Sequence, residues 1–595
     1  MDSVLLIVPP FASVEFQSLA LHNLQALGRK NGYCVDILYL NMEFAKLLGE
    51  GYRTFCNLNY FLLGERVFAK AAWGDLVDEQ IYPGLYNYRD ICKRDFNPIV
   101  FFPKNSELTI EELKRCEDLA ITWGKDLEKR FRSLNYKYIG VTSSFEQVNS
   151  GITVLKAVKR VTPGVVTFIG GFNCENRMAY GIDSLDPDRE IIDYIFSGES
   201  DSSFISFLKN SGSDNRIIYS EPFPSLNEIP NLDYTDYFVQ LKKYFPELLG
   251  SGNLSLAMES SRGCWWGEKS QCSFCGTSQR VRFREKSFSR IKNELEAAKK
   301  WGINRVHMAD LIMPEKHLTE LLPYLSNSRD KWRIYFEEKV SLNYNELKLL
   351  KSAGVMEIQP GIETLSNNIL KKMAKGTSLK QNITFLKDAT TVGFEIFWNI
   401  VWGIPGESIS DYKKMNELLP LISHLEPPVG IFHMTLVRFS PYFNNPEKYG
   451  ISNISPLKSY YKVYPNYVNI KDLALIFTCE YLNENVENPG EIEKLIQYIE
   501  VWNNSWKNFL TRPRLELSIK GDGTAVVLDT RELAELTIYN VSDDEILNLL
   551  EVKLFTGSKI QNKLINKKYA IKEGNDFIPL VLLGDDIRKN YGNSC

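Results

Sequence analysis

The sequence lacks the features that mark several large classes of protein. Lysine and arginine number 70 against 74 aspartate and glutamate, a net charge of −4, so no basic excess favours nucleic-acid binding. No apolar run approaches the roughly 20 residues of a membrane-spanning helix. The apolar run at residues 4–8 follows no basic residues and precedes no small-residue cleavage site, which argues against a secretory signal peptide. We therefore expect a cytoplasmic protein without nucleic-acid or membrane partners.

The composition is that of a globular protein with more than one core. Hydrophobic residues make up 44% of the chain and charged residues 24%. A chain of 595 residues is too long for a single core, so three domains are expected. Ten cysteines are spread along the chain and only three lie close together, which favours a reducing compartment over a disulfide framework.

Cys264, Cys272 and Cys275 form this cluster, with seven residues and then two residues between them. Outside a secretory context, three clustered thiols favour metal ligation over disulfide pairing. Zinc usually takes a fourth protein ligand, and the nearest histidine, His307, lies well downstream. Three protein ligands would instead leave one iron of a [4Fe–4S] cluster open to a substrate-like ligand. A structural or zinc-binding loop remains the alternative.

The first third of the chain alternates between strand-like and helix-like patterns, which predicts βαβ units and a parallel sheet. An open sheet of this kind binds ligands beyond the carboxyl ends of its strands. Hydroxyls and glycines at those ends suit a phosphate- and amide-bearing ligand, and a purely structural role is the alternative. An aromatic-rich, helical insert is expected at about residues 41–135. The predicted strands are residues 4–8, 33–40, 138–142, 165–169 and 194–196, and the candidate ligand residues are Pro10, Ser143, Ser144, Gln147, Gly170, Gly171, Phe172 and Glu199.

Six strand–helix pairs are predicted in the middle of the chain, after a Pro-punctuated linker at residues 216–253. Six pairs are too few for a closed eight-fold barrel and suit a partial (β/α)6 barrel over residues 254–440. The cysteine loop follows the first of these strands, at the end where barrel active sites lie. The predicted strands are residues 254–258, 305–309, 333–338, 356–359, 395–402 and 431–437.

The segment ESSRGCWWGEKSQCSFC, residues 259–275, resembles the radical S-adenosylmethionine (SAM) superfamily. The common pattern there is Cys, three residues, Cys, two residues, Cys, with an aromatic residue before the last cysteine. The longer first gap and the lead-in ESSRGCWWGEK are similar to cobalamin-dependent radical SAM enzymes that mature ribosomally made peptides, many of them C-methyltransferases. The resemblance covers about residues 4–443. It implies three cofactors: a [4Fe–4S] cluster, SAM and cobalamin.

The resemblance also implies roles for residues at the strand ends of the central domain. Phe274 would lie near the adenine of SAM, and Asp310 stands roughly where the family often holds the methionine amino group. The glycines that accompany that position in the family are missing here. Lys339 is a candidate partner for the SAM carboxylate.

Two further strand ends match segments that lie close to SAM in the family. Gln359 and Glu363 belong to the fourth-strand segment, and Gly403 belongs to the fifth, whose backbone meets the adenine. Ordinary turn and helix-terminus roles are the alternatives for Gly403 and Glu363. Tyr442, just after the sixth strand, is a candidate catalytic residue facing substrate or cobalamin, with core packing equally open.

The strand-end residues of the first domain, residues 1–215, would by this resemblance bind cobalamin in a Rossmann-like fold. The Asp-x-His-x-x-Gly signature of methionine-synthase-type cobalamin domains is absent. The resemblance therefore implies no histidine ligand to cobalt from that signature. His22 lies on the first predicted helix and is interpreted as a packed residue.

The C-terminal region, residues 441–595, is expected to be mixed α+β. A hairpin is predicted at residues 514–529 and a helix at residues 542–550. These elements are compatible with a small winged-helix-like module whose strand edge pairs with an extended leader peptide. A plain cap on the barrel is the alternative.

The resemblance implies C-methylation of a ribosomally synthesised precursor peptide at an unactivated carbon. The chemistry would use a 5′-deoxyadenosyl radical and methylcobalamin, with electrons from a flavodoxin- or ferredoxin-type donor. One alternative keeps the cofactors but replaces methylation by cyclisation or rearrangement. The other is a non-catalytic scaffold that binds metal or peptide.

Overall fold

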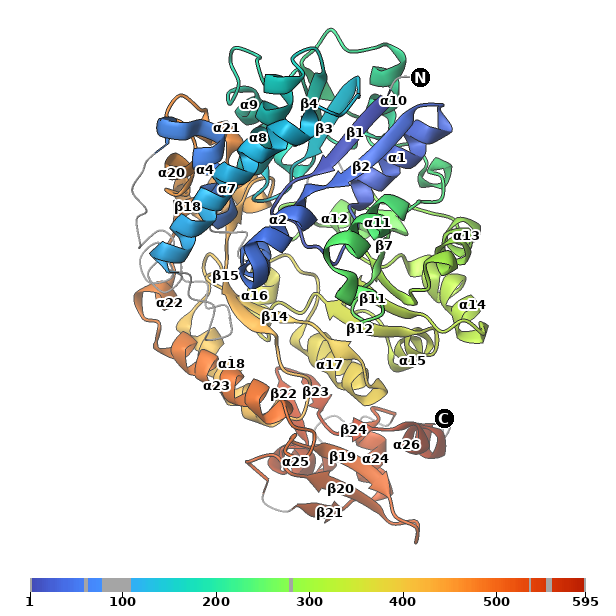
Figure 1. The fold of residues 1–595 in the computed structure, drawn as a ribbon. Coiled ribbons are helices and arrows are strands. Elements are labelled where there is room, and N and C mark those ends of the chain that lie inside the picture. The colour runs from blue at the N-terminus through green and yellow to red at the C-terminus, as the bar shows by residue number, and fades with distance from the viewer. Residues whose placement is uncertain are drawn as a thin grey trace.

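The structure, a computed structural model, describes residues 3–57, 62–77, 109–277, 282–534, 537–552 and 559–592. Three units follow one another along the chain, and the C-terminal unit projects from the other two (Figure 1). Within the described residues, no helix combines the length and the apolar character needed to cross a bilayer.

A six-stranded parallel sheet forms the N-terminal unit. Its order is β2-β1-β3-β4-β5-β6, so the strand order reverses between β1 and β3. Side chains alternate between the faces: Leu5 and Ile7 enter one core, whereas Leu6 and Val8 enter the other. Both faces are therefore buried, as expected for a parallel sheet between helices. The strands are β1 (Ser3–Val8), β2 (Cys34–Tyr39), β3 (Tyr138–Thr142), β4 (Val166–Gly170), β5 (Tyr194–Ser197) and β6 (Ile217–Tyr219).

Helices cover both faces of this sheet (Figure 1). On one face α1 (Leu19–Lys30) packs beside α10 (Asp201–Lys209). On the other face lie α4 (Leu63–Trp73), α7 (Ile110–Phe131) and α8 (Val148–Val161). The predicted insert supplies α4 and α7, together with α2 (Leu40–Leu48) and α3 (Tyr52–Asn57), and is mostly helical where it is described. Residues 58–61 and 78–108 of the insert lie outside the described residues.

The segment predicted as a linker packs against the first sheet. Its start is β6, so the sheet extends beyond the predicted domain end at residue 215. Its helix α11 (Thr235–Tyr244) covers the edge strand β2. There the Asp236 carboxylate accepts from the Ile37 N–H at 3.0 Å, and Gln240 accepts from the Tyr39 N–H at 2.9 Å. Side chains thus satisfy an edge that would otherwise be open to pairing.

The central unit contains a parallel strand at each of the six predicted places, but the sixth, predicted at residues 431–437, ends at His433, and Leu436–Val437 pairs antiparallel with a later strand. β7 (Leu256–Met258), β10 (Arg305–Met308), β11 (Arg333–Glu338), β12 (Val355–Pro360) and β13 (Glu395–Ile396) form one sheet. β14 (Asn399–Trp402) continues β13 and pairs with β15 (Gly430–His433). The predicted strand at residues 395–402 is thus interrupted. It nevertheless stays joined to β12, because Phe397 N–H donates to the Ile358 carbonyl at 2.9 Å.

The C-terminal unit is mixed α+β, as predicted. β19 (Leu515–Ile519) and β20 (Ala525–Asp529) form the expected hairpin, with β21 (Ile538–Asn540) on one side and β24 (Leu582–Leu583) on the other. The helix α24 (Asp543–Leu549) follows, then α25 (Lys559–Asn566) and a second hairpin. Arg588 of α26 (Asp585–Gly592) donates to Asp388 at 2.7 Å and so attaches this unit to the central one.

Candidate functional site

The cysteine loop starts where β7 ends and is closed at its base by a short ribbon. β8 (Ser261–Arg262) pairs antiparallel with β9 (Arg284–Glu285). Within the loop, Cys264 caps the short helix α12 (Trp265–Lys269), and its Sγ accepts from Gly267 N–H at 3.4 Å. All three thiols are half-buried and unpaired by disulfides.

The tip of the loop rests on two other parts of the chain. Ser273 donates from its N–H to the Met373 carbonyl at 2.9 Å and from its hydroxyl to the Lys372 carbonyl at 3.0 Å. The Ser273 carbonyl accepts from Tyr442 N–H at 3.0 Å. The Tyr442 ring is 1% exposed and packs edge-on against Tyr449. Tyr442 therefore supports the cysteine loop from the core instead of facing a substrate, contrary to the catalytic role expected for it.

The donor set fits an iron–sulfur cluster. Among the described residues, no group of three or more His, Cys, Asp or Glu is arranged to hold a single metal ion. Structural zinc needs four ligands around one ion. A [4Fe–4S] cluster spreads its ligands over several irons, and three cysteines leave one iron open. Burial raises the pKa of the Cys272 thiol, and the nearby Lys375 ammonium opposes that rise.

Glu363 and Lys375 meet beside this loop, and Gln359 lies near the end of β12. Gln359 accepts from the Tyr335 hydroxyl at 2.8 Å, and Glu363 lies 2.8 Å from the Lys375 ammonium. Burial raises the pKa of Glu337 to about 7, and the charge of Glu363 adds to the rise. Gln359 and Glu363 were expected here. Lys375 and Glu337 were not, because neither belongs to a recognisable motif.

Asp310 does not face this space. Its carboxylate accepts from the N–H groups of Ser260 and Ser261 at 2.7 and 2.8 Å, and from the Ser260 hydroxyl. Only 1% of Asp310 is exposed. Asp310 therefore fixes the lead-in to the cysteine loop instead of holding the SAM amino group, because its carboxylate is buried against this segment and accepts three hydrogen bonds from it.

His317 belongs to the same buried hydrogen-bonded group as Asp310 and Ser260. Its Nε2 lies 2.7 Å from the Ser260 hydroxyl oxygen. Because this hydroxyl donates to Asp310, His317 Nε2 must carry the proton and donate to Ser260. Burial lowers the pKa of His317 to about 4, so the ring stays neutral in the fold.

We expect His317→Gln to make the protein less sensitive to acid. The unfolded chain protonates this imidazole as the pH falls through about 6.5, whereas the fold resists until about 4. Acidification from pH 7 to pH 5 should therefore favour unfolding by about 2 kcal/mol through His317 alone. Urea denaturation of both proteins at pH 7 and pH 5 measures the difference. Equal losses in wild type and variant would contradict this account.

Lys339 lies beside the cysteine loop, and Gly403 directly follows β14. The Lys339 ammonium lies over the Trp266 ring, and burial lowers its pKa to about 8. Gly403 has a φ of 79°, and a Cβ there would lie 2.4 Å from His433 Nε2. Gly403 is thus required by both its backbone conformation and its close neighbour. The Phe274 ring lies 5.6 Å from the Lys375 ammonium.

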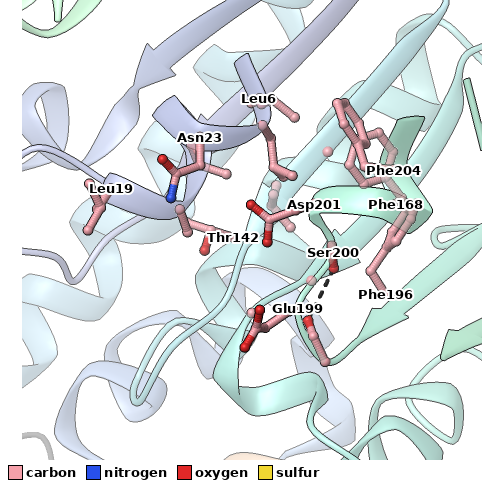
Figure 2. A pocket seen from close by; sticks show the side chains of 18 of the residues that line it. Leu6, Leu19, Asn23, Thr142, Phe168, Phe196, Glu199, Ser200, Asp201 and Phe204 are labelled. Carbon is pink, nitrogen blue, oxygen red and sulfur yellow. Dashed lines mark hydrogen bonds between the residues drawn. The ribbon is translucent and has the colours of Figure 1, made fainter. Parts of the chain in front are cut away.

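A cavity of about 400 Å³ opens at the carboxyl edge of the first sheet (Figure 2). Its floor is apolar, with Leu6, Phe168 and Phe204 pointing into it, and α1 and α10 form its sides. Gly140 belongs to this floor, and a Cβ there would lie 2.0 Å from the Phe168 ring. Of the predicted ligand residues, Gly170, Gly171 and Glu199 line the cavity. An apolar pocket with a few polar groups at its mouth fits part of a large cofactor.

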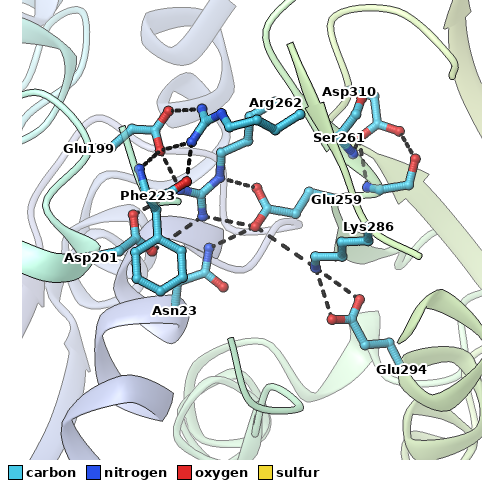
Figure 3. Close-up of polar contacts among 12 residues, drawn as sticks. Asn23, Glu199, Asp201, Phe223, Glu259, Ser261, Arg262, Lys286, Glu294 and Asp310 are labelled. Carbon is cyan, nitrogen blue, oxygen red and sulfur yellow. Dashed lines mark hydrogen bonds and ion pairs between the residues drawn. The ribbon is translucent and has the colours of Figure 1, made fainter. Parts of the chain in front are cut away.

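Charged side chains in the lining of this cavity are joined by ion pairs and hydrogen bonds (Figure 3). Arg262 donates to Glu259 at 2.9 Å, to Asp201 at 2.8 Å and to Glu199 at 3.0 Å. Arg284 also donates to Glu199. These bonds lower the pKa of Glu199 against the effect of burial. The Glu199 carboxylate therefore joins the first sheet to the cysteine loop instead of being free for a cofactor amide.

Most of the remaining predicted ligand residues hydrogen-bond to, or pack against, other residues near the carboxyl ends of the strands. Ser143 is buried and accepts from Asn173 at 3.0 Å. Gln147 accepts from Ser144 N–H at 3.0 Å and donates to the Pro9 carbonyl at 2.7 Å. The Pro10 carbonyl accepts from the Ser150 hydroxyl, and the Phe172 ring contacts the Phe145 ring. Ser144 and Gln147 also line a second cavity of about 850 Å³, beside residues 11–16.

Residues 258–419 match the model of the Radical SAM superfamily. A hopanoid C-3 methylase of Methylococcus capsulatus is 26% identical over 266 residues, which are 42% of this chain and 50% of the relative. The chain thus spans about half the length of that curated relative.

Two solved structures share the fold. TsrM of Kitasatospora setae, a radical S-adenosylmethionine methyltransferase with cobalamin and a [4Fe–4S] cluster bound, superposes with a TM-score of 0.52 at 13% identity, over 84% of this chain and 91% of TsrM. OxsB, a cobalamin-dependent S-adenosylmethionine radical enzyme with aqua-cobalamin bound, gives 0.51 at 14% identity, over 85% of this chain and 67% of OxsB. The chain therefore contains a radical SAM domain within an α/β fold that these cobalamin enzymes share.

Proposed function

We propose that this chain is a cobalamin-dependent radical SAM enzyme that methylates an unactivated carbon of a ribosomally made precursor peptide. The observation that carries the proposal is the position of the cysteine loop. Its last residues lie near Glu363 and Lys375, and the bonds of Arg262 attach its base to Glu199 and Asp201 in the lining of the cavity on the first sheet. The proposed cluster site and the proposed cobalamin cavity are thus adjacent to each other.

The residues divide between the three cofactors. Cys264, Cys272 and Cys275 would hold the cluster, with Phe274, Gln359, Glu363 and Gly403 around SAM. The cavity between α1, α10 and the first sheet would take part of cobalamin. When bound, these groups supply a carbon radical and a transferable methyl group, which no amino-acid side chain provides.

The chain's own task is to position the cofactors and to limit water. Trp265 donates from Nε1 to the Met313 carbonyl at 3.3 Å, and Trp266 lies under the Lys339 ammonium. These contacts fix both rings of the cysteine loop against neighbouring segments of the central unit. Lys339 stays a candidate for binding the SAM carboxylate, because its ammonium lies over the Trp266 ring of the cysteine loop.

A peptide substrate is favoured by the C-terminal unit. β21 is the end strand of its sheet among the described residues, and an extended peptide can add to such an edge. An electron donor of the flavodoxin or ferredoxin type would complete the system. A small apolar substrate is the second candidate, because one curated relative is a hopanoid methylase and the lining of the 850 Å³ cavity includes Phe11, Phe16 and Phe145.

The test is to give the reduced, cofactor-loaded protein SAM with a deuterated methyl group and the small peptide encoded beside its gene. The proposal predicts that mass spectrometry finds the peptide heavier by one CD3 in place of hydrogen. A product without the label, but with altered hydrogen count, would instead support cyclisation or rearrangement. Label found only in apolar extracts would support the second substrate class.

A further inference from the structure

The segment between α16 (Asn367–Lys372) and α17 (Leu379–Val392), residues 373–378, forms a platform that packs against the cysteine loop. Its first residue, Met373, accepts from Ser273 N–H at 2.9 Å. Farther along, Gly376 lies against the Trp266 ring, where a Cβ would be 2.1 Å from Trp266 Cζ2. Gly376 has a φ of 68°, which also favours glycine. The platform therefore meets the loop both before and after Lys375.

Lys375 directs its side chain from this platform toward the thiols. Its ammonium lies 2.8 Å from Glu363 Oε1 and 5.6 Å from the centre of the Phe274 ring. The Lys375 side chain is only 14% exposed, and that of Glu363 is 20% exposed. Gly361 leaves the room for it, since a Cβ there would lie 2.6 Å from Lys375 Nζ. The position of this charge is therefore fixed by packing on several sides.

Several groups around Lys375 can carry a negative charge. Cys272, Cys275 and Glu363 each favour the charged form of Lys375 against the effect of burial. Lys339 is the other lysine close by, and burial lowers its pKa to about 8. Lys375, whose pKa is raised, is therefore the more firmly charged of the two.

We propose that Lys375 is a positioning residue that holds Glu363 beside the cluster and raises the reduction potential of that cluster. The inference rests on the proposed function. One-electron reduction adds negative charge to a cluster already bound by three thiolates, and a fixed positive charge nearby stabilises the reduced form. Removal of the Lys375 charge also leaves the partly buried Glu363 carboxylate without this ion pair, so Glu363 would no longer be fixed in the position from which it would contact SAM.

The experiment is an anaerobic redox titration followed by electron paramagnetic resonance. Lys375→Met should lower the equilibrium constant for cluster reduction about tenfold, which corresponds to about 59 mV for one electron. Lys375→Arg should restore most of the loss, because it keeps the charge. Lys371→Met is the matched control, since Lys371 lies on α16 with an exposed side chain, and its potential should equal that of wild type.

A second variant tests the same ion pair by removing its negative charge. Glu363→Gln removes the negative partner, so its cluster potential should move upward while that of Lys375→Met moves downward. Weaker binding of SAM, by about tenfold, is expected in both variants. If Lys375→Met takes up no cluster, the upward shift in Glu363→Gln decides the question.

The outcomes separate the two proposals. Wild-type protein that takes up no iron and sulfide overturns the proposed function and this inference with it. Wild-type protein that carries a cluster, with unchanged potentials in Lys375→Met and Glu363→Gln, overturns the inference alone. Opposite shifts in the two variants, with none in Lys371→Met, support it.

Discussion

Replacement of Cys264, Cys272 or Cys275 by alanine is expected to abolish cluster binding and SAM cleavage together. On the proposed function each thiol is one of three protein ligands of the cluster, so the loss of one leaves an iron without its protein ligand. Iron and sulfide analysis and the visible absorption of anaerobically reconstituted protein measure the cluster, and 5′-deoxyadenosine formation measures the activity.

Cys34→Ala is the matched control. Cys34 is exposed and belongs to the edge strand β2, remote in sequence from the loop, so its loss should leave iron content and activity at wild-type levels. A full cluster in Cys272→Ala would contradict the assignment of the ligands.

The second large effect is expected at the cavity of the first sheet. Leu24 is a half-buried residue of α1 that lines the 400 Å³ cavity. Leu24→Trp places a large ring in this cavity and should abolish cobalamin binding while the cluster is retained. Leu24→Met conserves volume and should bind cobalamin like wild type. Cobalamin per chain, read from its absorption after growth with the cofactor, distinguishes the two. Equal cobalamin in both variants would place the cofactor elsewhere.

Much of the scaffold could be predicted from local patterns. Apolar runs between amphipathic segments locate the parallel strands of both sheets, because buried parallel strands are nearly all apolar. The cysteine segment can be predicted equally well, because the spacing of the ligands is a local property of the sequence. The strand at residues 395–402 is interrupted where it changes its pairing partner from β12 to β15, a change between distant segments that no local pattern contains.

The site itself is less predictable, because partners decide the role of a charged residue. Asp310 and Glu199 were expected to face cofactors, yet each is held by groups from other segments: Ser260 for Asp310, Arg262 and Arg284 for Glu199. Lys375 belongs to no motif, and only the fold brings it to Glu363. His22 behaves as predicted: it is fully buried, and burial lowers its pKa to about 4.

The measurement that tests the central claim most directly is the fate of SAM with the reduced, anaerobically reconstituted protein. The account predicts that 5′-deoxyadenosine forms with dithionite and not without it, and that the Cys272→Ala variant forms none. A wild-type protein that carries zinc in place of iron, or that holds a cluster but leaves SAM intact under these conditions, would contradict it.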